Sequence, residues 1–384
     1  MLWKPKYALT EEQRRMYASE KLTNFRSISK ALATRSSYGL TSADRVSPEI
    51  ETELAELGQF AEVAYSMVPL DFLFQNITTL LERDFPLEGY HTLQDAILVS
   101  SVEGSVGHLP SFVVYRPSIK QLVVAISGTS SVELALHDLR ALKHRHPSHR
   151  GYAHSGFWAL YKGIKPLLLD AIRKGLECHE VTELAITGHS MGGSISYLLC
   201  MDLLAGDGVT DLPLSSGLSL KLAVFGAPRT GDASLVEYWR ELVAAYKTSH
   251  GSEKMTEYSV KAYNDGKLLP PFYVLIMTRI LGAGVPALPP SQLGYQHFAK
   301  EPLYLDRTRL YRVPSSESEH STFTAAPPAT DELRSLEFPR GGHNYYNKRD
   351  FERLCRRIRW LDKVDPDISG WEERYRKKFA TLHA

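Results

Sequence analysis

The first clear hydrophobic period in the chain is helical and begins near Glu51. Its apolar positions recur three and four residues apart, at Leu54, Leu57, Phe60, Ala61, Ala64 and Tyr65. Such spacing places these side chains on one side of an amphipathic helix. Two runs rich in β-forming residues follow, 111–115 and 121–126, and the short Pro117-Ser118 link between them predicts a hairpin.

Helical and strand-like segments then alternate along the middle of the chain. The helical patterns cover 157–176, 191–205 and 233–246, and the apolar strand-like runs cover 183–187, 220–225 and 258–263. Alternation with short connections requires right-handed crossovers between neighbouring strands, which makes those strands parallel. The pattern therefore predicts an α/β fold with a mostly parallel central sheet flanked by helices.

The two ends of the chain have a different composition from the middle. Residues 1–48 are polar and predict an N-terminal extension with a short helix near 11–22. The Ser/Pro-rich stretch 313–330 predicts a loop, and the sequence after about 346 predicts a charged amphipathic helix. We expect one domain over 49–362, followed by a charged C-terminal tail, 363–384. A solvated helix face and contact with an anionic membrane are the two interpretations of this charged end.

Composition and charge exclude several classes of protein. The chain has 384 residues, of which 43% are hydrophobic and 23% charged, as is usual for globular proteins. With 45 Lys and Arg against 44 Asp and Glu it lacks the basic excess of a nucleic-acid binder, so we expect no nucleic-acid partner. Three scattered cysteines predict neither a disulfide scaffold nor a zinc site. Because neither a secretory leader nor a long apolar span is evident, a cytoplasmic location is expected.

The segment Gly188-His189-Ser190-Met191-Gly192 carries the chemistry. It is a G-x-S-x-G motif between an apolar strand and a helix of small residues, which is the context of a nucleophilic serine. Turning from strand to helix at one residue crowds the backbone, and glycine at 188 and 192 removes the Cβ atoms that would collide. The alternative is a glycine-rich turn needed only for packing.

A nucleophilic serine needs a base and an acid that orients the base. In this strand–serine–helix arrangement the chain order is serine, acid, histidine. Asp265 follows the predicted strand 258–263 and is the candidate acid, with a plain Asp-Gly turn as the alternative. His343 follows two glycines and is the candidate base; His297 and His320 are the other histidines after the acid.

The oxyanion of an acyl-transfer reaction needs hydrogen-bond donors. One should be the backbone N–H of Met191, directly after the nucleophile. The other should come from Thr129, which follows the apolar run 121–126 and offers both an N–H and a hydroxyl. A Ser/Thr cap for the next helix is an alternative role for this segment, and the two roles can coexist.

Several motifs occur together in the order of a known family, and the chain resembles the fungal class 3 lipases of the α/β-hydrolase superfamily. They include an Ala-x-x-Ala-Tyr-like helix, an apolar strand ending Ser-Gly-Thr, His-x-Gly-Phe, the serine motif, Phe-Gly-x-Pro-Arg-x-Gly-Asp, Val-Pro-x-Leu-Pro-Pro and Gly-Tyr-x-His. These segments are 61–65, 123–131, 154–157, 188–193, 225–232, 285–290 and 294–297. In the last motif the histidine, His297 here, is usually structural in the family.

The resemblance, which covers about residues 55–350, implies an α/β-hydrolase fold and hydrolysis of acyl esters. It implies a triad of Ser190, Asp265 and His343, with Thr129 and Met191 in the oxyanion hole. No metal ion or organic cofactor takes part in that chemistry.

The sequence departs from the family pattern in three places. Ser127 stands where the family commonly has arginine, and segment 132–139, at the position of the lid, lacks the expected tryptophan. The acid is separated from the Val-Pro motif by an apolar insertion, 266–284, so Asp306 is the fallback for Asp265. The insertion is expected either to form an acyl-chain wall or a membrane-touching flap, or to be a buried extra helix.

We therefore expect a serine hydrolase that cleaves carboxylic esters of lipids, of the acylglycerol lipase type, through an acyl-enzyme. Its partners would be a lipid or ester substrate and, transiently, a membrane or lipid-droplet surface. An esterase or acyltransferase acting on smaller or phenolic esters is one alternative. A catalytically degenerate lipid-binding scaffold is the other.

Overall fold

The structure is a computed structural model. It describes Arg14 and residues 34–128, 142–206, 212, 217–262, 289, 291–325, 343, 345–347 and 349–383. Thr129 and Asp265 lie outside the described residues. So do the segment at the lid position, the apolar insertion and all but Arg14 of the helix expected near 11–22.

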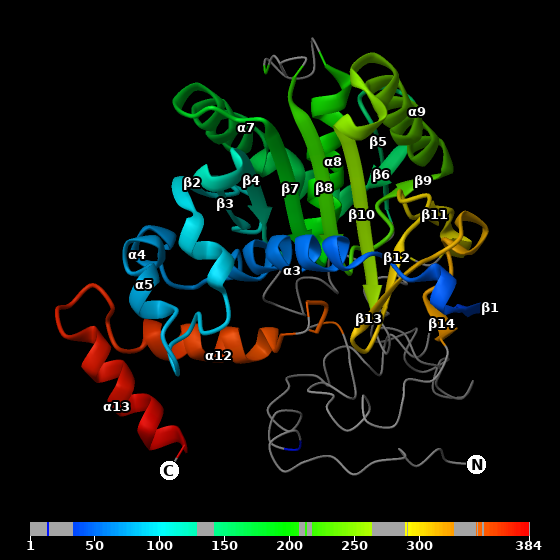
Figure 1. Ribbon diagram of the computed structural model, residues 1–384. Helices are drawn as coiled ribbons and strands as arrows, with labels where there is room; N and C mark the ends of the chain where they lie inside the picture. The colour runs from blue at the N-terminus through cyan, green and yellow to red at the C-terminus, as the bar shows by residue number, and fades with distance from the viewer. Residues whose placement is uncertain are drawn as a thin grey trace.

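An eight-stranded sheet forms the centre of the molecule (Figure 1). Its order is β13 (Arg309–Arg312), β12 (Leu303–Asp306), β10 (Met255–Ala262), β8 (Ser219–Phe225), β7 (Glu183–His189), β4 (Gln121–Ile126), β3 (Pro110–Arg116) and β2 (Ile97–Glu103). The five strands from β12 to β4 are parallel, while β13, β3 and β2 are antiparallel to their neighbours. The expected mostly parallel sheet is confirmed, and so is the hairpin of β3 and β4.

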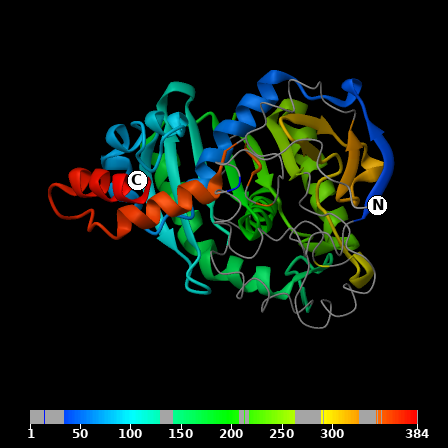
Figure 2. The same cartoon turned by 90° about the horizontal axis from the view of Figure 1, so that it is seen from below.

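Helices cover both faces of this sheet. Helix α3 (Pro48–Val63) crosses one face, and α7 (Ser155–Cys178), α8 (Met191–Ala205) and α9 (Ala233–His250) lie on the other. Figure 2 shows α3 and α7 on opposite sides of the strands. The short helices α4 (Leu70–Gln75) and α5 (Ile77–Leu80) lie beyond α3. Among the described residues, no helix is both long and apolar enough to cross a bilayer.

The strand sequences read as continuous apolar runs because both faces of the sheet are buried. All six residues of β4 are buried. Leu122, Val124 and Ile126 join the core beneath α7, α8 and α9, whereas Val123 and Ala125 join the core beneath α3. Successive side chains of a strand point to opposite faces, so one apolar run serves two cores.

Small sheets lie beside the central one. Strand β1 (Arg35–Leu40) pairs in parallel with β14 (Thr322–Ala325). The prediction of a loop throughout 313–330 was therefore wrong at β14, because its partner strand is nearly 300 residues away in the sequence. A four-stranded sheet contains β5 (Lys143–Arg145), β6 (Tyr152–His154), β9 (Gly231–Asp232) and β11 (Tyr295–Gln296).

The C-terminal segment forms two helices rather than the single helix expected. Helix α12 (Phe351–Asp362) runs below α3, and α13 (Trp371–His383) follows after a turn (Figure 1). Trp371 and Tyr375 are buried in the core on the α3 side of the sheet. Part of the charged tail 363–384 thus packs on the main domain; the domain limits themselves stay a prediction.

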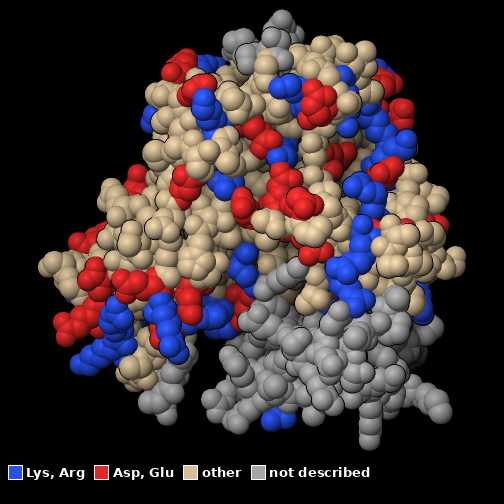
Figure 3. Space-filling view, viewed as in Figure 1, with Lys and Arg blue, Asp and Glu red and all other residues tan. Residues whose placement is uncertain are grey.

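Acidic and basic side chains are interspersed over the face shown in Figure 3, as expected for a chain with a formal net charge of +1. The visible surface has no extended field of one sign. Electrostatic attraction over the whole face therefore cannot be what selects a partner.

We expect Trp371→Ala to destabilise the protein by about 3–5 kcal/mol, because the indole is 6% exposed and packs edge-on against Phe72 and Phe85. Urea unfolding of the two proteins measures the difference. The control Ile368→Ala, at a side chain that is 56% exposed, should change the free energy of unfolding by no more than about 0.5 kcal/mol. Equal stability of Trp371→Ala and the parent would show that α13 does not contribute to the core.

Candidate active site

Ser190 stands at a strained turn between β7 and α8. Its backbone has φ 59° and ψ −129°, a region that residues with a Cβ rarely adopt. The Ser190 N–H donates to the Phe225 carbonyl at the end of β8, 2.8 Å away. The serine is half-buried, so its side chain lies at the sheet edge and is not enclosed in the core. This geometry is that of a nucleophile held at a strand-to-helix bend.

The glycines around Ser190 are required by close backbone contacts. A Cβ on Gly188 would lie 2.5 Å from backbone atoms of Gly192. A Cβ on Gly192 would overlap the carbonyl oxygen of Ile126 at the end of β4, and one on Gly193 would lie 2.8 Å from the Ala227 Cβ. The elbow is therefore clamped against two neighbouring strands, which holds the strained conformation in place.

Two segments next to Ser190 bear on the predicted oxyanion donors, Met191 and Thr129. Met191 is the first residue of α8, and the first N–H groups of a helix have no partner within it. On the other side lies Gly128, where an added Cβ would be 3.1 Å from the Ser190 Cβ. Gly128 directly precedes Thr129, so the strand end that leads to Thr129 is beside the nucleophile, although Thr129 itself lies outside the described residues.

His343 is buried at the same edge of the sheet, with 2% of its surface exposed. Its Cε1 would lie 2.9 Å from a Cβ on Gly226, the residue after the Phe225 carbonyl that binds Ser190. Its ring centroid is 4.5 Å from that of His189, the residue before Ser190. The structure thus brings the loop of His343 to the strand ends that carry Ser190.

A buried carboxylate fixes the segment just after His343. Glu62 of α3 accepts hydrogen bonds from the Asn347 amide at 2.7 Å, the Arg349 guanidinium at 3.2 Å and the Tyr90 hydroxyl at 2.6 Å. Glu62 is 4% exposed, so these contacts are made away from water and are stronger than on the surface. Helix α3 therefore binds the segment that follows His343, through Asn347 and Arg349.

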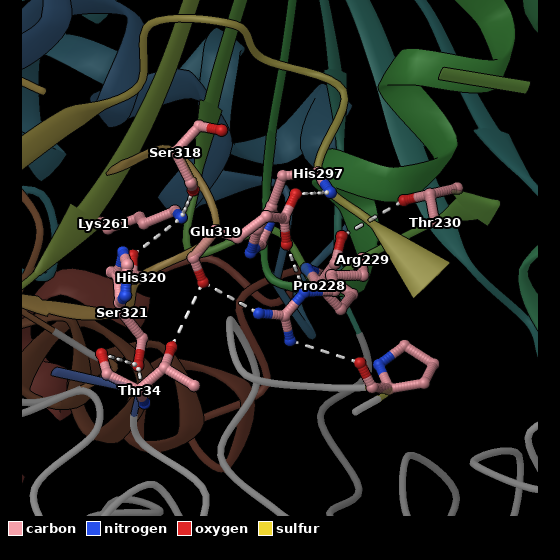
Figure 4. A network of polar contacts seen from close by, with 11 residues as sticks. Thr34, Pro228, Arg229, Thr230, Lys261, His297, Ser318, Glu319, His320 and Ser321 are labelled. Carbon is pink, nitrogen blue, oxygen red and sulfur yellow. Dashed lines mark hydrogen bonds and ion pairs between the residues drawn. The ribbon is translucent and has the colours of Figure 1, made fainter. Parts of the chain in front are cut away.

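A second polar network holds the segment 317–321 against the end of β10 (Figure 4). The ammonium group of Lys261 donates to the carbonyl oxygens of Ser318 at 2.5 Å and His320 at 3.1 Å. Burial lowers the pKa of Lys261 to about 7; the nearby Arg229 lowers it further, and the carboxylate of Glu319 partly opposes the shift. The Lys261 amine thus replaces water as the partner of these carbonyl groups.

Arg229 and Glu319 complete this network. The Arg229 Nε is 2.8 Å from the Glu319 carboxylate, and its Nη2 donates to the Glu319 backbone carbonyl at 3.0 Å. The other carboxylate oxygen of Glu319 accepts the backbone N–H of His297 at 2.8 Å (Figure 4). The arginine of the Pro-Arg motif is therefore a buried tie between segments, 2% exposed.

The alternative histidines contact acidic side chains of this network. His297 binds Glu319 through its backbone, as above, and the His320 Nδ1 is 3.0 Å from the Glu317 carboxylate. His154, from the His-x-Gly-Phe motif, caps α7, where its ring accepts the N–H of Phe157 at 3.5 Å.

The acid stays open between the two candidates. Asp265 lies three residues beyond the end of β10 and outside the described residues. Asp306 ends β12, which is parallel to β10, so the fallback acid lies at the same edge of the sheet. Its carboxylate is 3.0 Å from Arg307.

Ser127, at the position of the family arginine, has a buried hydroxyl with no hydrogen-bond partner among the described residues.

Several residues near this site were not predicted from the sequence. Glu62, Lys261 and Glu319 join segments that are far apart in the chain, and no local pattern indicates such pairs. His189 and Tyr65 lie inside motifs that were recognised, the serine motif and the Ala-x-x-Ala-Tyr-like helix. A polar residue inside a motif that is otherwise apolar or glycine-rich was the available signal.

A serine at the carboxyl end of a parallel strand, followed at once by a helix, is the arrangement of the α/β-hydrolase fold. Lipase II from Rhizopus niveus has the same fold, with a TM-score of 0.54 at 16% identity over 81% of this chain and 98% of that one. The α/β-hydrolase fold expected from the sequence is thereby confirmed.

Sequence comparison finds a family match in the middle of the chain. Residues 123–261 match the family described as lipase (class 3). Lipase A from Sodiomyces alcalophilus is 24% identical over 204 residues, which are 47% of this chain and 42% of that protein. Secreted mono- and diacylglycerol lipase 1 from Fusarium solani is 21% identical over 208 residues, 54% of this chain and 50% of the relative. The resemblance to the fungal class 3 lipases is confirmed, and it is carried by residues 123–261.

The chain spans only about two fifths of Lipase A and half of the Fusarium solani lipase. The matched region 123–261 includes Ser190 and ends before Asp265 and His343. The triad and the oxyanion residues therefore stay predictions.

We expect Gly192→Ala to destabilise the protein by about 1–3 kcal/mol or more, because its methyl group would overlap the Ile126 carbonyl of a neighbouring strand. Urea unfolding measures the loss. Gly39→Ala is the control, since a Cβ at Gly39 would meet nothing within 4 Å. If both variants were as stable as the parent, the elbow would not be as tightly clamped as the contacts indicate.

We expect the stability of the protein to depend on the charge of Lys261. Its folded-state pKa of about 7 lies below the usual 10.5, so the unfolded chain binds more protons between these values and stability rises with pH there. From pH 7 to pH 9 this contribution is about 2 kcal/mol. Lys261→Met should lack it.

The measurement is the free energy of unfolding at the two pH values for the parent and the variant. Lys254→Met is the control, because the Lys254 ammonium binds the Gly217 carbonyl at an exposed site. The control should follow the parent. The same rise with pH in Lys261→Met would contradict the assignment to this lysine.

Proposed function

We propose that the protein is a serine hydrolase that cleaves carboxylic esters of lipids, of the acylglycerol lipase type. The observation that carries the proposal is the strained elbow at Ser190 with the loop of His343 on the adjoining strand ends. The class 3 lipase match and the relatives named as lipases support the reaction class.

In the proposed mechanism, the Ser190 Oγ attacks the ester carbonyl carbon while the His343 imidazole takes the proton of the Ser190 hydroxyl. Met191 and Thr129 donate hydrogen bonds to the oxyanion, and Asp265 stabilises the imidazolium. The imidazolium then protonates the departing alcohol, which leaves an acyl-enzyme. Water, deprotonated by His343, attacks the acyl group, releases the fatty acid and restores the serine.

The acylglycerol substrate and its physical state belong to the same proposal. The Fusarium solani relative is named a mono- and diacylglycerol lipase, which favours a substrate of this kind here. Such lipids gather in aggregates, so we infer a transient contact with a membrane or lipid-droplet surface. A cytoplasmic location of this protein stays a prediction. The Fusarium solani relative is named a secreted lipase.

We expect Ser190→Ala to abolish labelling by a fluorophosphonate probe and to lower kcat on a soluble ester on the order of 10⁶-fold, as loss of a triad serine does. Ser105→Ala, an exposed serine bonded to the Gly163 carbonyl, is the control and should label like the parent. Labelling that persists in Ser190→Ala would refute the assignment of the nucleophile.

A series of esters then separates the substrate classes. Higher kcat/KM on long-chain acylglycerols than on short-chain or phenolic esters supports the lipase assignment. The reverse order identifies an esterase of smaller substrates. A parent protein that neither takes the probe nor hydrolyses any ester is a non-catalytic scaffold.

A further inference from the structure

A chain of hydrogen bonds passes through the buried ring of His189, the residue before the proposed nucleophile. The Tyr65 hydroxyl at the end of the α3 region is 2.9 Å from the His189 Nδ1. On the opposite side of the ring, the His189 Nε2 is 2.8 Å from the backbone carbonyl oxygen of His343. His189 is 5% exposed, so solvent does not compete for these contacts.

The direction of each bond follows from its partners. A carbonyl oxygen can only accept, so the His189 Nε2 carries a hydrogen and donates it to His343. Burial, together with the neighbouring His343, lowers the pKa of His189 well below its usual range, so the ring is neutral. Its Nδ1 is then an acceptor and receives the Tyr65 hydroxyl hydrogen, with the His189 backbone carbonyl as a second, more distant acceptor at 3.2 Å. The Tyr65 oxygen also lies against Gly128, where an added Cβ would overlap it.

These bonds and the close contact with Gly128 connect three segments on which the proposed chemistry depends. Gly128 belongs to the strand end that leads to Thr129, His189 precedes Ser190, and the carbonyl belongs to His343 itself. The Phe351 ring packs edge-on against both residues of the Tyr65–His189 hydrogen bond. Its centroid is 4.8 Å from the Tyr65 ring centroid and 5.5 Å from that of His189. The rings exclude water and allow little displacement of either polar side chain.

We propose that Tyr65 and His189 are positioning residues that set the main-chain position of His343 relative to Ser190. The inference rests on the proposed hydrolase function. His189 does so by holding the His343 carbonyl, and Tyr65 does so by fixing the hydrogen of His189 on Nε2. Without the Tyr65 hydroxyl, the His189 ring can place its hydrogen on Nδ1 and lose the bond to His343.

The side chains of leucine and glutamine separate this role from simple packing. His189→Leu fills the space but has no donor for the His343 carbonyl. His189→Gln carries an amide N–H near the position of Nε2 and can restore that bond. A displacement of about 1 Å at a reacting group can lower a rate on the order of 100-fold. We expect kcat to fall by about that factor in the leucine variant, with KM changed less than about 2-fold, and glutamine to recover about 10-fold.

Tyr65→Phe is the milder test, because it keeps the ring and its contact with Phe351. We expect kcat to fall about 10-fold with KM unchanged. Tyr246→Phe is the control: its hydroxyl likewise makes one internal hydrogen bond, donating to the Leu218 carbonyl at 2.8 Å, just before β8. The control should lose similar thermal stability while its kcat stays within about 2-fold of the parent.

These variants give the proposal a clear point of failure. Equal kcat in the leucine and glutamine variants of His189 would overturn it, as would a Tyr65→Phe variant no slower than Tyr246→Phe. If His189→Leu does not fold, the comparison of Tyr65→Phe with Tyr246→Phe decides alone. A parent protein without ester hydrolysis or probe labelling would instead refute the proposed function, and this inference with it.

Discussion

The site depends on one strained residue, Ser190, whose backbone lies where few residues with a Cβ are found. A conformation of this kind costs about 1–3 kcal/mol and persists only where surrounding contacts leave no alternative. Here the Phe225 carbonyl binds the Ser190 N–H, and the backbone of Gly192 lies directly against the Ile126 carbonyl. Contacts with the buried central sheet thereby offset the strain at Ser190, and its hydroxyl is held at the edge of that sheet.

Helix α3 and the turn after it serve the site as much as the core. Their residues Gly58, Glu62 and Tyr65 are four and three positions apart, so they share one side of the helical segment. Gly58 leaves room for Asn347, Glu62 binds the same side chain, and Tyr65 reaches His189. A helix that the hydrophobic period identified as amphipathic thus also contacts the segment after His343 directly, and the turn after it reaches the His343 carbonyl through His189.

The sequence predicted the central architecture well because its signals are local. The central strands β4, β7, β8 and β10 each appear as an apolar run, α7 and α9 have a helical period, and α8 is a run of small and apolar residues directly after the serine motif. The pairing of β1 with β14 has no such signal, since each is short and depends on a partner far away in the chain. The serine elbow could be predicted because its chemistry lies within a few residues, whereas Lys261 and the carbonyls of 318 and 320 meet only in the folded chain.

The loops around the site are held by polar contacts, and this follows from what a loop offers. A loop has unpaired carbonyl and N–H groups that must find partners when they are buried. Lys261 supplies them for the segment 317–321 and His189 for the His343 carbonyl, while Glu62 binds the side chains of Asn347 and Arg349 in the segment after His343. Hydrogen bonds are directional, whereas apolar contacts are not, so these links specify the orientation of a loop as well as its proximity. Catalysis by a serine and an imidazole requires such orientation, and buried polar residues provide it without touching the substrate.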